Sequence, residues 1–364
     1  MTQEIAGLEY LEHLPEVDGW LSTSGAKAIC LAGAAQRRLG IAGDIFEIGV
    51  HHGKSAILLS HLLDPATERL RVNDLFADQE ANRSGSGRGS LEKFRANVER
   101  LRPGFHAFDV HSGESSRLTT RETGTNCRLF HVDGGHSAEE TESDLRCAAR
   151  ATTAAGMILL DDYFNPEFPA VAEGAHRFLF AEREWAPVVI AFNKVGFVRR
   201  GSAAAYRKAL TDRALLDPLR LGFRPVHFHG CDALRLFAYP EPGDFRLDIR
   251  LPAGPVTSRP GEAVTTRIEV ANVGALDILD DPPNDVRLDH NIFREAAHLG
   301  EGGQRLRLAP LPHGERRTYD YTLAAPADPG NYRLAFDGVL ENVAWLGNLG
   351  GPVSVLELSV SATS

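Results

Sequence analysis

The sequence predicts an α/β protein with a doubly wound sheet, followed by a C-terminal antiparallel β-sandwich domain. Between Ala42 and about Arg200, short apolar runs alternate with stretches of helical period, which is the pattern of βαβ units around a parallel sheet. After Asp244 the apolar residues recur with period two and no long helical pattern appears. Because turn residues separate the two patterns, we expect domains at residues 1–240 and 245–364.

Length and composition fit two folded domains and limit the classes of partner. The 364 residues are 43% hydrophobic and 24% charged, which suffices to bury a core in each domain. The charge of −10 argues against a broad contact with nucleic acid or an anionic membrane, because both require clustered Lys and Arg. No apolar run approaches the ~20 residues that span a bilayer, and the first residues lack the order of a signal peptide. We therefore expect a cytoplasmic protein with reduced cysteines and neither a nucleic-acid nor a membrane partner.

The elements of the first domain follow from short apolar runs and from helical periodicity. Strands buried on both faces are continuously apolar, and Gly156 is expected to end the helix before the fifth strand. Asn193-Lys194 separates two apolar runs that we interpret as an antiparallel hairpin. The expected elements are a helix over 25–39, strands over 44–50, 70–74, 105–110, 128–133 and 156–161, helices over 55–63 and 139–155, and a hairpin of 188–192 with 195–199.

A glycine turn joins the first strand to its helix, within Glu47-Ile-Gly-Val-His-His-Gly-Lys-Ser55. Gly49 and Gly53 allow the backbone to pass close to a ligand at the helix N-terminus. A phosphate-binding loop needs four residues between its glycines, and this turn has three. An S-adenosylmethionine site requires an acid at the strand end, a glycine turn and an acid after the second strand, which Glu47 and Asp74 supply. A plain strand-to-helix link remains the simpler alternative.

Three more carboxylates follow later strands of the predicted sheet. Asp133 ends the fourth strand, and Asp161 and Asp162 end the fifth. Ligands of open α/β sheets bind beyond the carboxyl ends of the strands, so these acids are expected to converge. Mg²⁺ would relieve their mutual repulsion and leave positions open for substrate. The alternatives are a helix cap at Asp133, loop acids at 161 and 162, and a Walker-type pair that depends on the short phosphate loop.

Histidines near these acids suggest two further sites. His136 lies three residues after Asp133, where an imidazole can accept a proton from a metal-activated hydroxyl. A rival zinc site would use His227, His229 and Cys231 on one face of an extended segment. No fourth ligand lies nearby in the sequence, which favours a packed strand instead.

The motifs together resemble the class I S-adenosylmethionine-dependent methyltransferases of the macrocin O-methyltransferase type, which have a Rossmann-like sheet. The resemblance rests on Gly19-Trp-Leu-Ser22, Phe46-Glu-Ile-Gly-Val50 with Gly53-Lys-Ser55, Val132-Asp-Gly-Gly-His-Ser137 and Leu160-Asp-Asp-Tyr163. It implies that Asp133, Asp161 and Asp162 hold Mg²⁺ and that His136 is the catalytic base beside Asp133. The residues implied to bind S-adenosyl-L-methionine are Glu47, Gly49, His51, Gly53, Lys54, Ser55, Asp74, Ser112 and Asp133.

These observations predict O-methylation of a sugar hydroxyl, with a small-molecule glycoside or saccharide as acceptor. The alternatives are a Mg²⁺-dependent nucleotide-binding phosphotransferase or hydrolase and a non-catalytic saccharide-binding protein. Related Fe(II) hydroxylases would use Asp133 and His136 for another metal. The C-terminal domain resembles Ig-like β-sandwich modules of polysaccharide-biosynthesis proteins, which implies carbohydrate binding or homo-oligomerisation. The Gly- and Ser-rich loop at 78–89 is expected to close over the substrate.

Overall fold

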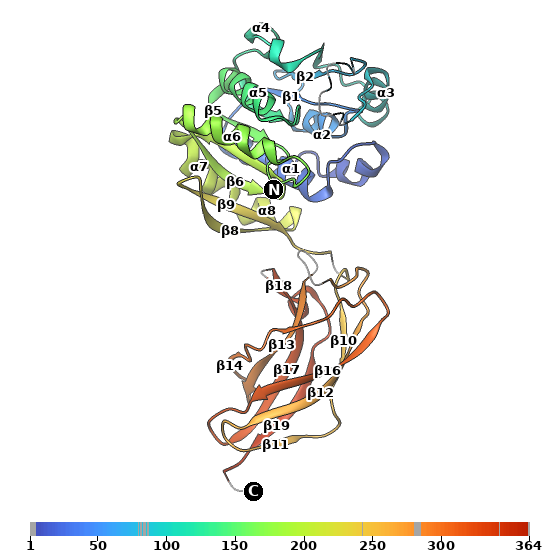
Figure 1. Ribbon diagram of the computed structural model, residues 1–364, viewed down its shortest axis with the longest axis vertical. Helices are drawn as coiled ribbons and strands as arrows, with labels where there is room; N and C mark the ends of the chain where they lie inside the picture. Colours follow the sequence, from blue (N-terminus) through green and yellow to red (C-terminus); the bar gives the residue numbers. More distant parts are fainter. Residues whose placement is uncertain are drawn as a thin grey trace. The chain divides into compact units, whose positions relative to one another are not determined.

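The computed structural model describes residues 5–362 apart from 79, 81, 83, 84, 86, 242, 280–284 and 342. The chain divides into two compact units, Met1–Ala238 and Tyr239–Ser364 (Figure 1). Much of the loop at 78–89, including Arg83, Ser84 and Ser86, lies outside the described residues.

The first unit is built on one mixed sheet with the order β3-β2-β1-β4-β5-β7-β6-β9-β8. The first five strands in this order are parallel, which confirms the predicted α/β class. The expected hairpin continues the sheet beyond β5, and a second hairpin that the sequence did not predict adds the last two strands. The strands are β1 (Asp44–Ile48), β2 (Leu70–Asp74), β3 (Phe108–Ser112), β4 (Cys127–Val132), β5 (Thr152–Leu160), β6 (Trp185–Ala191), β7 (Lys194–Arg199), β8 (Leu221–Phe228) and β9 (Cys231–Ala238).

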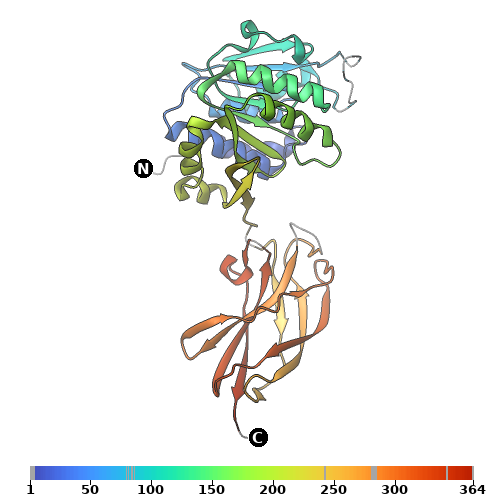
Figure 2. The same cartoon turned by 60° about the vertical axis from the view of Figure 1, so that its left-hand side comes forward.

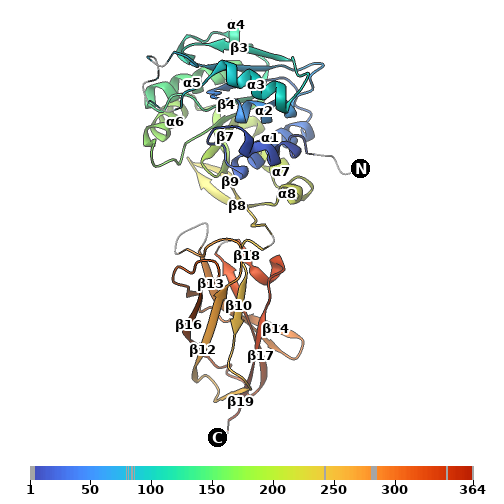
Figure 3. The ribbon, with the colours of Figure 1, turned by 90° about the vertical axis from the view of Figure 1, so that its right-hand side faces the viewer.

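Helices cover both faces of this sheet (Figure 2, Figure 3). Successive strand residues point to opposite faces, so Ile45 and Phe46 belong to two separate cores. One face packs against α1 (Thr23–Arg38), α2 (Lys54–Leu62), α3 (Leu91–Leu101), α7 (Arg200–Leu210) and α8 (Arg213–Leu219), and the other against α5 (Ala138–Ala151) and α6 (Pro169–Ala181). The remaining short elements are η1 (Glu9–Glu16), η2 (Ser115–Arg117) and α4 (Thr120–Thr123).

Several element boundaries differ from the sequence prediction, and the largest difference concerns the helix expected over 139–155. The helix expected over 139–155 ends at Ala151, and residues from Thr152 onward form β5. Gly156 is therefore a strand residue, and a Cβ there would lie 2.8 Å from the carbonyl oxygen of Cys127. It permits a close approach of two strands and does not end a helix. The third strand begins at Phe108 rather than Phe105.

The second unit consists of two sheets around its own apolar core. Its strand pairs are antiparallel apart from β11 with β19, as the period-two pattern predicted. One sheet has the order β10-β12-β16 and the other β11-β19-β17-β13-β14. The elements are β10 (Leu247–Arg250), β11 (Val256–Ser258), β12 (Ala263–Asn272), β13 (Val286–Arg294), β14 (Ala297–Glu301), β15 (Leu306–Arg307), β16 (Arg316–Ala324), β17 (Gly330–Leu340), β18 (Ala344–Trp345), η3 (Leu346–Leu349) and β19 (Ser354–Val360).

Among the described residues, none of the helices combines the length and the apolar character needed to cross a bilayer.

Candidate active site

The turn after β1 requires glycine at two positions. Gly49 has φ +87°, and a Cβ there would lie 1.8 Å from the carbonyl oxygen of Asp133. Gly53 has φ +93° and precedes α2, and its Cβ would lie 2.5 Å from the Phe94 ring. Since a larger residue would be strained and would collide at both places, the two glycines allow β1, β4 and α3 to come together beneath the turn.

Asp74 at the end of β2 holds this turn in shape. Its Oδ2 accepts hydrogen bonds from the backbone N–H groups of Val50 at 2.7 Å and His51 at 2.8 Å. Its Oδ1 accepts one from the N–H of Phe76 at 2.6 Å. This acid, which the sequence analysis assigns to cofactor binding, therefore also fixes the backbone of the glycine turn.

A cavity of about 550 Å³ lies beside the turn at the carboxyl ends of the parallel strands. This is the edge of an open α/β sheet at which ligands bind. Most of the residues expected in the site line this cavity, namely Gly49, His51, Lys54, Ser55, Asp74, Asp133, His136, Asp161 and Asp162.

Three residues expected to contact the cofactor lie elsewhere. Glu47 is completely buried. It lies within β1, and its side chain contacts His131 of the neighbouring strand β4. Gly53 packs against Phe94 at the start of α2. Ser112 is exposed at the end of β3, and the four residues after it, 113–116, line the cavity.

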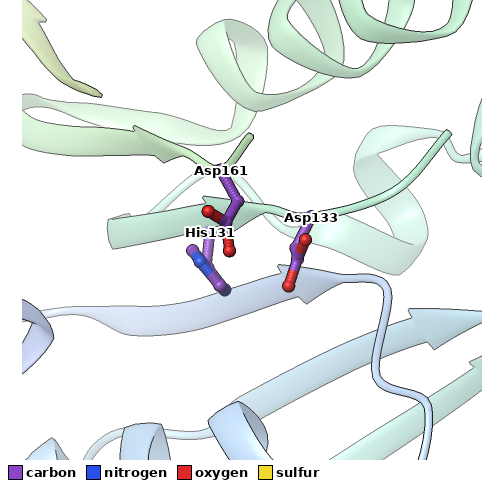
Figure 4. A group of neighbouring side chains, drawn as sticks. All are labelled: His131, Asp133 and Asp161. Carbon is purple, nitrogen blue, oxygen red and sulfur yellow. The ribbon is translucent and has the colours of Figure 1, made fainter. Parts of the chain in front are cut away.

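A buried cluster of possible ligands lies at the ends of β4 and β5 (Figure 4). One donor atom each from His131, Asp133 and Asp161 lies within 4.8 Å of the others. Glu47 Oε1 is 2.8 Å from His131 Nδ1 and orients the ring. Among the described residues, His131 Nε2 has no hydrogen-bond partner, so this nitrogen is available to a ligand. Asp162 is not a member of the cluster.

Lys194 supplies a positive charge to this cluster. Its ammonium group forms a buried ion pair with Asp161. Burial opposes the charge, but Asp161 and Asp133 together raise the pKa of Lys194 above its usual value. Burial and the neighbouring Asp161 raise the pKa of Asp133 as well. The cluster thus holds more negative charge than its one lysine neutralises.

These residues fit a divalent cation. Asp133 and Asp161 place two carboxylates against the single ammonium group of Lys194, and burial together with their mutual repulsion raises the pKa of Asp133; a bound cation would relieve this repulsion. The unpartnered nitrogen of His131 adds a further donor. Carboxylates suit Mg²⁺, and an imidazole donor widens the choice to transition metals such as Mn²⁺.

His136 is held in place on two sides. Its Nε2 lies 3.2 Å from Asp162 Oδ2, and its ring stacks on Phe168 with centroids 3.7 Å apart. Asp162 Oδ1 accepts hydrogen bonds from Asn165 at 2.9 Å and Asn193 at 3.2 Å. Burial opposes ionisation of Asp162, but hydrogen bonds from His136 and Asn165 lower its pKa. An ionised carboxylate on Nε2 orients the ring and stabilises its protonated form.

The rival zinc site proposed from the sequence is wrong. His227 lies in β8, His229 occupies the turn with φ +49°, and Cys231 begins β9. The segment is therefore a hairpin and does not present the three side chains on one extended face. His229 Nε2 is instead 2.6 Å from the Tyr163 hydroxyl.

The sequence analysis did not identify three residues that lie in or beside the candidate site. His131 lies between apolar residues of β4, so only the structure shows that its side chain contacts Glu47. Lys194 was interpreted as a turn residue of the hairpin. Asp144, on α5, lines the cavity and is 1% exposed. Periodicity gives no signal for any of them, because each role depends on a neighbour distant in the sequence.

The family comparison agrees with this geometry. Residues 46–163 match the sequence profile of a family described as a methyltransferase domain. The chain carries a methyltransferase domain. The match spans the glycine turn, the acidic cluster and His136, and it implies S-adenosylmethionine as the methyl donor. No curated protein sequence matches the chain.

Solved structures similar to this methyltransferase chain include two O-methyltransferases. The O-methyltransferase NovP is 17% identical, with 50% of this chain and 83% of that chain covered and a TM-score of 0.43. CalS11, a TDP-rhamnose 3'-O-methyltransferase of calicheamicin biosynthesis, is 17% identical, with 55% and 88% covered and a TM-score of 0.40. A CARDB domain from Pyrococcus furiosus is 18% identical, with 32% and 88% covered and a TM-score of 0.22.

Proposed function

We propose that the chain is an S-adenosylmethionine- and divalent-metal-dependent O-methyltransferase that methylates a sugar hydroxyl of a glycosylated natural product or saccharide. One observation carries the proposal: a single cavity is lined by the glycine turn at Gly49, by the carboxylates of Asp133 and Asp161, and by the oriented imidazole of His136. Methyl transfer to a hydroxyl needs these three parts, which are a donor site, a means of acidifying the hydroxyl and a base.

His136 is the proposed base. With its proton on Nε2, next to Asp162, the neutral ring presents Nδ1 as the proton acceptor. The acceptor oxygen forms a bond to the methyl carbon as the carbon–sulfur bond breaks, and the hydroxyl proton passes to His136. Asp162 then stabilises the imidazolium. A divalent cation held by Asp133 and Asp161 would lower the pKa of the acceptor hydroxyl.

Asp133 and Asp161 are the proposed ligands of the cation, with His131 adding a nitrogen donor and Asp162 lying beside His136. Mg²⁺ is the cation proposed from the carboxylates. Activity restored by Mg²⁺, and by Mn²⁺ to a greater degree, would indicate that His131 also ligates, because imidazole binds Mn²⁺ more readily than Mg²⁺.

A sugar acceptor is supported by the aromatic residues of the cavity. Trp20 lines the cavity and is 80% exposed, and its ring lies 5.2 Å from that of His51. Phe168 contributes a second ring behind His136. Aromatic faces offer an apolar surface on which the C–H face of a sugar ring packs.

A methyl-transfer assay tests the proposal. Labelled S-adenosylmethionine is incubated with sugar nucleotides, glycosides and oligosaccharides, with Mg²⁺ or with EDTA. We expect metal-dependent methylation of at least one class, and no transfer to any class would contradict the proposal. Thermal shifts with S-adenosylhomocysteine and with ATP separate this function from phosphotransfer, since a ligand of the folded state raises Tm.

For residues 245–364 we propose a carbohydrate-binding or oligomerisation role. Its support is the resemblance of this segment to modules of polysaccharide-biosynthesis proteins. Sedimentation of the full chain, with and without oligosaccharides, tests both roles. A monomer that binds no oligosaccharide would contradict them.

A further inference from the structure

The first unit contains a second cavity, distinct from the candidate active site. Its volume is about 310 Å³, and it lies among α6, β6, the start of α7 and the turn between β8 and β9 (Figure 1). The described residues that line it are all different from those lining the cavity beside the glycine turn. They include His176, Phe180, Trp185, Arg200 and His229, and the proposed methyl transfer uses none of these five.

Trp185 brings a buried hydrogen-bond donor to the second cavity. Its side chain is 1% exposed, and within the described part of the chain its Nε1 has no hydrogen-bond partner. A buried indole N–H usually finds an acceptor, and one that is left unpaired costs free energy. Because Trp185 lines the second cavity, an acceptor bound there can supply the missing hydrogen bond.

Arg200 gives the second cavity a positive charge. Its Nε donates to the carbonyl oxygen of Arg183 at 2.7 Å, and its Nη1 lies 3.2 Å from Cys231 Sγ. These contacts position the guanidinium group and leave Nη2 for a ligand. Among the described residues that line the cavity, none is acidic, so the lining itself does not neutralise this charge. The cavity therefore favours an anion, and the planar guanidinium group suits a carboxylate.

His229 adds a neutral donor rather than a second charge. Burial and the neighbouring His176 hold the pKa of His229 below its usual value. Its Nε2 lies 2.6 Å from the hydroxyl of Tyr163. A neutral ring that accepts from this hydroxyl on Nε2 carries its own proton on Nδ1. The second cavity thus combines one cation with neutral N–H donors.

Aromatic rings supply the apolar part of the second cavity. Phe180 is 74% exposed, and the rings of His176 and His229 lie 4.5 Å apart at an angle of 67°. Aromatic side chains pack well against the face or edge of another planar ring. The volume is at the lower end of the range of about 300–1,000 Å³ that is usual for small-molecule sites, which suits a ligand of one or two rings.

We propose that the second cavity binds a planar aromatic carboxylate. The ring of this ligand packs against the aromatic side chains, and its carboxylate accepts hydrogen bonds from Arg200 and from the indole N–H of Trp185. A neutral aromatic compound would leave the charge of Arg200 unpaired, and a small aliphatic acid would leave the aromatic surface uncovered. The ligand therefore needs both parts.

The test follows the indole N–H of Trp185 by ¹⁵N NMR of the full chain. The sequence has three tryptophans, so Trp20→Phe and Trp345→Phe identify the signal of Trp185 by elimination. The probes are benzoate, the neutral benzyl alcohol and acetate. Benzoate should shift the Trp185 signal in a saturable manner and bind at least about fivefold more tightly than either of the other two, because charge-assisted hydrogen bonds are stronger than neutral ones.

Two variants test the origin of this preference. Arg200→Gln, at an exposed position, should reduce the preference for benzoate over benzyl alcohol to less than about twofold. Lys208→Gln removes one positive charge from the same helix outside the cavity and should keep the wild-type preference. Phe180→Ala, also at an exposed position, should weaken the binding of benzoate at least about threefold.

Several outcomes would overturn the inference. A Trp185 signal that benzoate does not move, equal binding of benzyl alcohol or acetate, or an unchanged preference in Arg200→Gln would each contradict it. A shift of the Trp20 signal alone would place benzoate in the cavity beside the glycine turn and would also refute the second site. A similar loss of preference in Lys208→Gln would indicate an effect of net charge only. Each of these outcomes leaves the proposed methyl transfer intact.

Discussion

Lys194 and Asp161 form a largely buried ion pair at the carboxyl end of β5, inside the candidate active site. The pair joins two segments of one sheet, since Lys194 begins β7 and Asp161 follows β5. It gives the acidic cluster a resident positive charge that is independent of any bound ion. The cluster thereby keeps two carboxylates close together in the folded chain.

Replacement of Lys194 tests how much this ion pair contributes to the stability of the folded protein. Lys194→Met should lower the free energy of unfolding by about 3–5 kcal/mol, because it leaves a buried carboxylate unpaired. Urea denaturation measures the change. Lys208→Met, at an exposed position of α7, should alter stability by no more than about 0.5 kcal/mol. Equal stability of the two variants would show that the ion pair contributes nothing to folding.

His136→Ala tests the base. Loss of a general base typically lowers turnover by about 10²–10⁴-fold, so kcat should fall in this range while the affinity for S-adenosylhomocysteine is unchanged. His106→Ala, at an exposed position, serves as the control and should retain full activity. Undiminished kcat in His136→Ala would remove the residue from the reaction.

Chelation tests the cation. EDTA should reduce methyl transfer at least about tenfold, and an excess of Mg²⁺ should restore it. With Mg²⁺ present, Asp161→Asn should be as slow as the wild type is in EDTA. Addition of EDTA should not lower the activity of this variant further. Transfer that is insensitive both to EDTA and to this substitution would exclude a catalytic cation at the cluster.

Gly49→Ala tests the close approach of β1 and β4. The added Cβ would collide with the carbonyl of Asp133, and its φ of +87° is itself unfavourable. We expect a loss of more than about 3 kcal/mol of stability, or no folded protein. Gly40→Ala is the matched control, because Gly40 also has a positive φ of +69° but no atom within 4 Å of its Cβ position. It should cost only about 1 kcal/mol.

Asp337 makes the stability of the second unit depend on pH. Burial raises the pKa of this carboxyl to about 6, although the N–H of Gly347 donates to it at 2.8 Å. A raised folded-state pKa means that the stabilising contribution is complete below the unfolded pKa of about 3.9 and is lost as the pH rises through about 6. Relative to Asp337→Asn, the wild type should therefore become less stable between pH 4 and pH 7 in chemical denaturation. A constant difference across this range would contradict the prediction.

Several features of the fold could be predicted because they depend on local pattern. The period-two alternation after Asp244 predicted the antiparallel sheets, and the apolar runs predicted the parallel strands. The boundary at Ala151 was missed, because the preference of Thr152 for a strand and the role of Gly156 depend on contact with β4. The hairpin of β8 and β9 was also missed, since its segment was treated as one extended strand.

The sequence by itself determined which acids and histidines follow the strands, since residues at the carboxyl ends of parallel strands share one edge of the sheet. Most of the residues that it predicted for the site therefore line the cavity. Only the tertiary structure decided how these groups are paired: His131 with Glu47, Asp161 with Lys194, and His136 with Asp162. Such pairs form between side chains on different strands and loops, whose separation depends on register, twist and packing and is not encoded in the local spacing of residues.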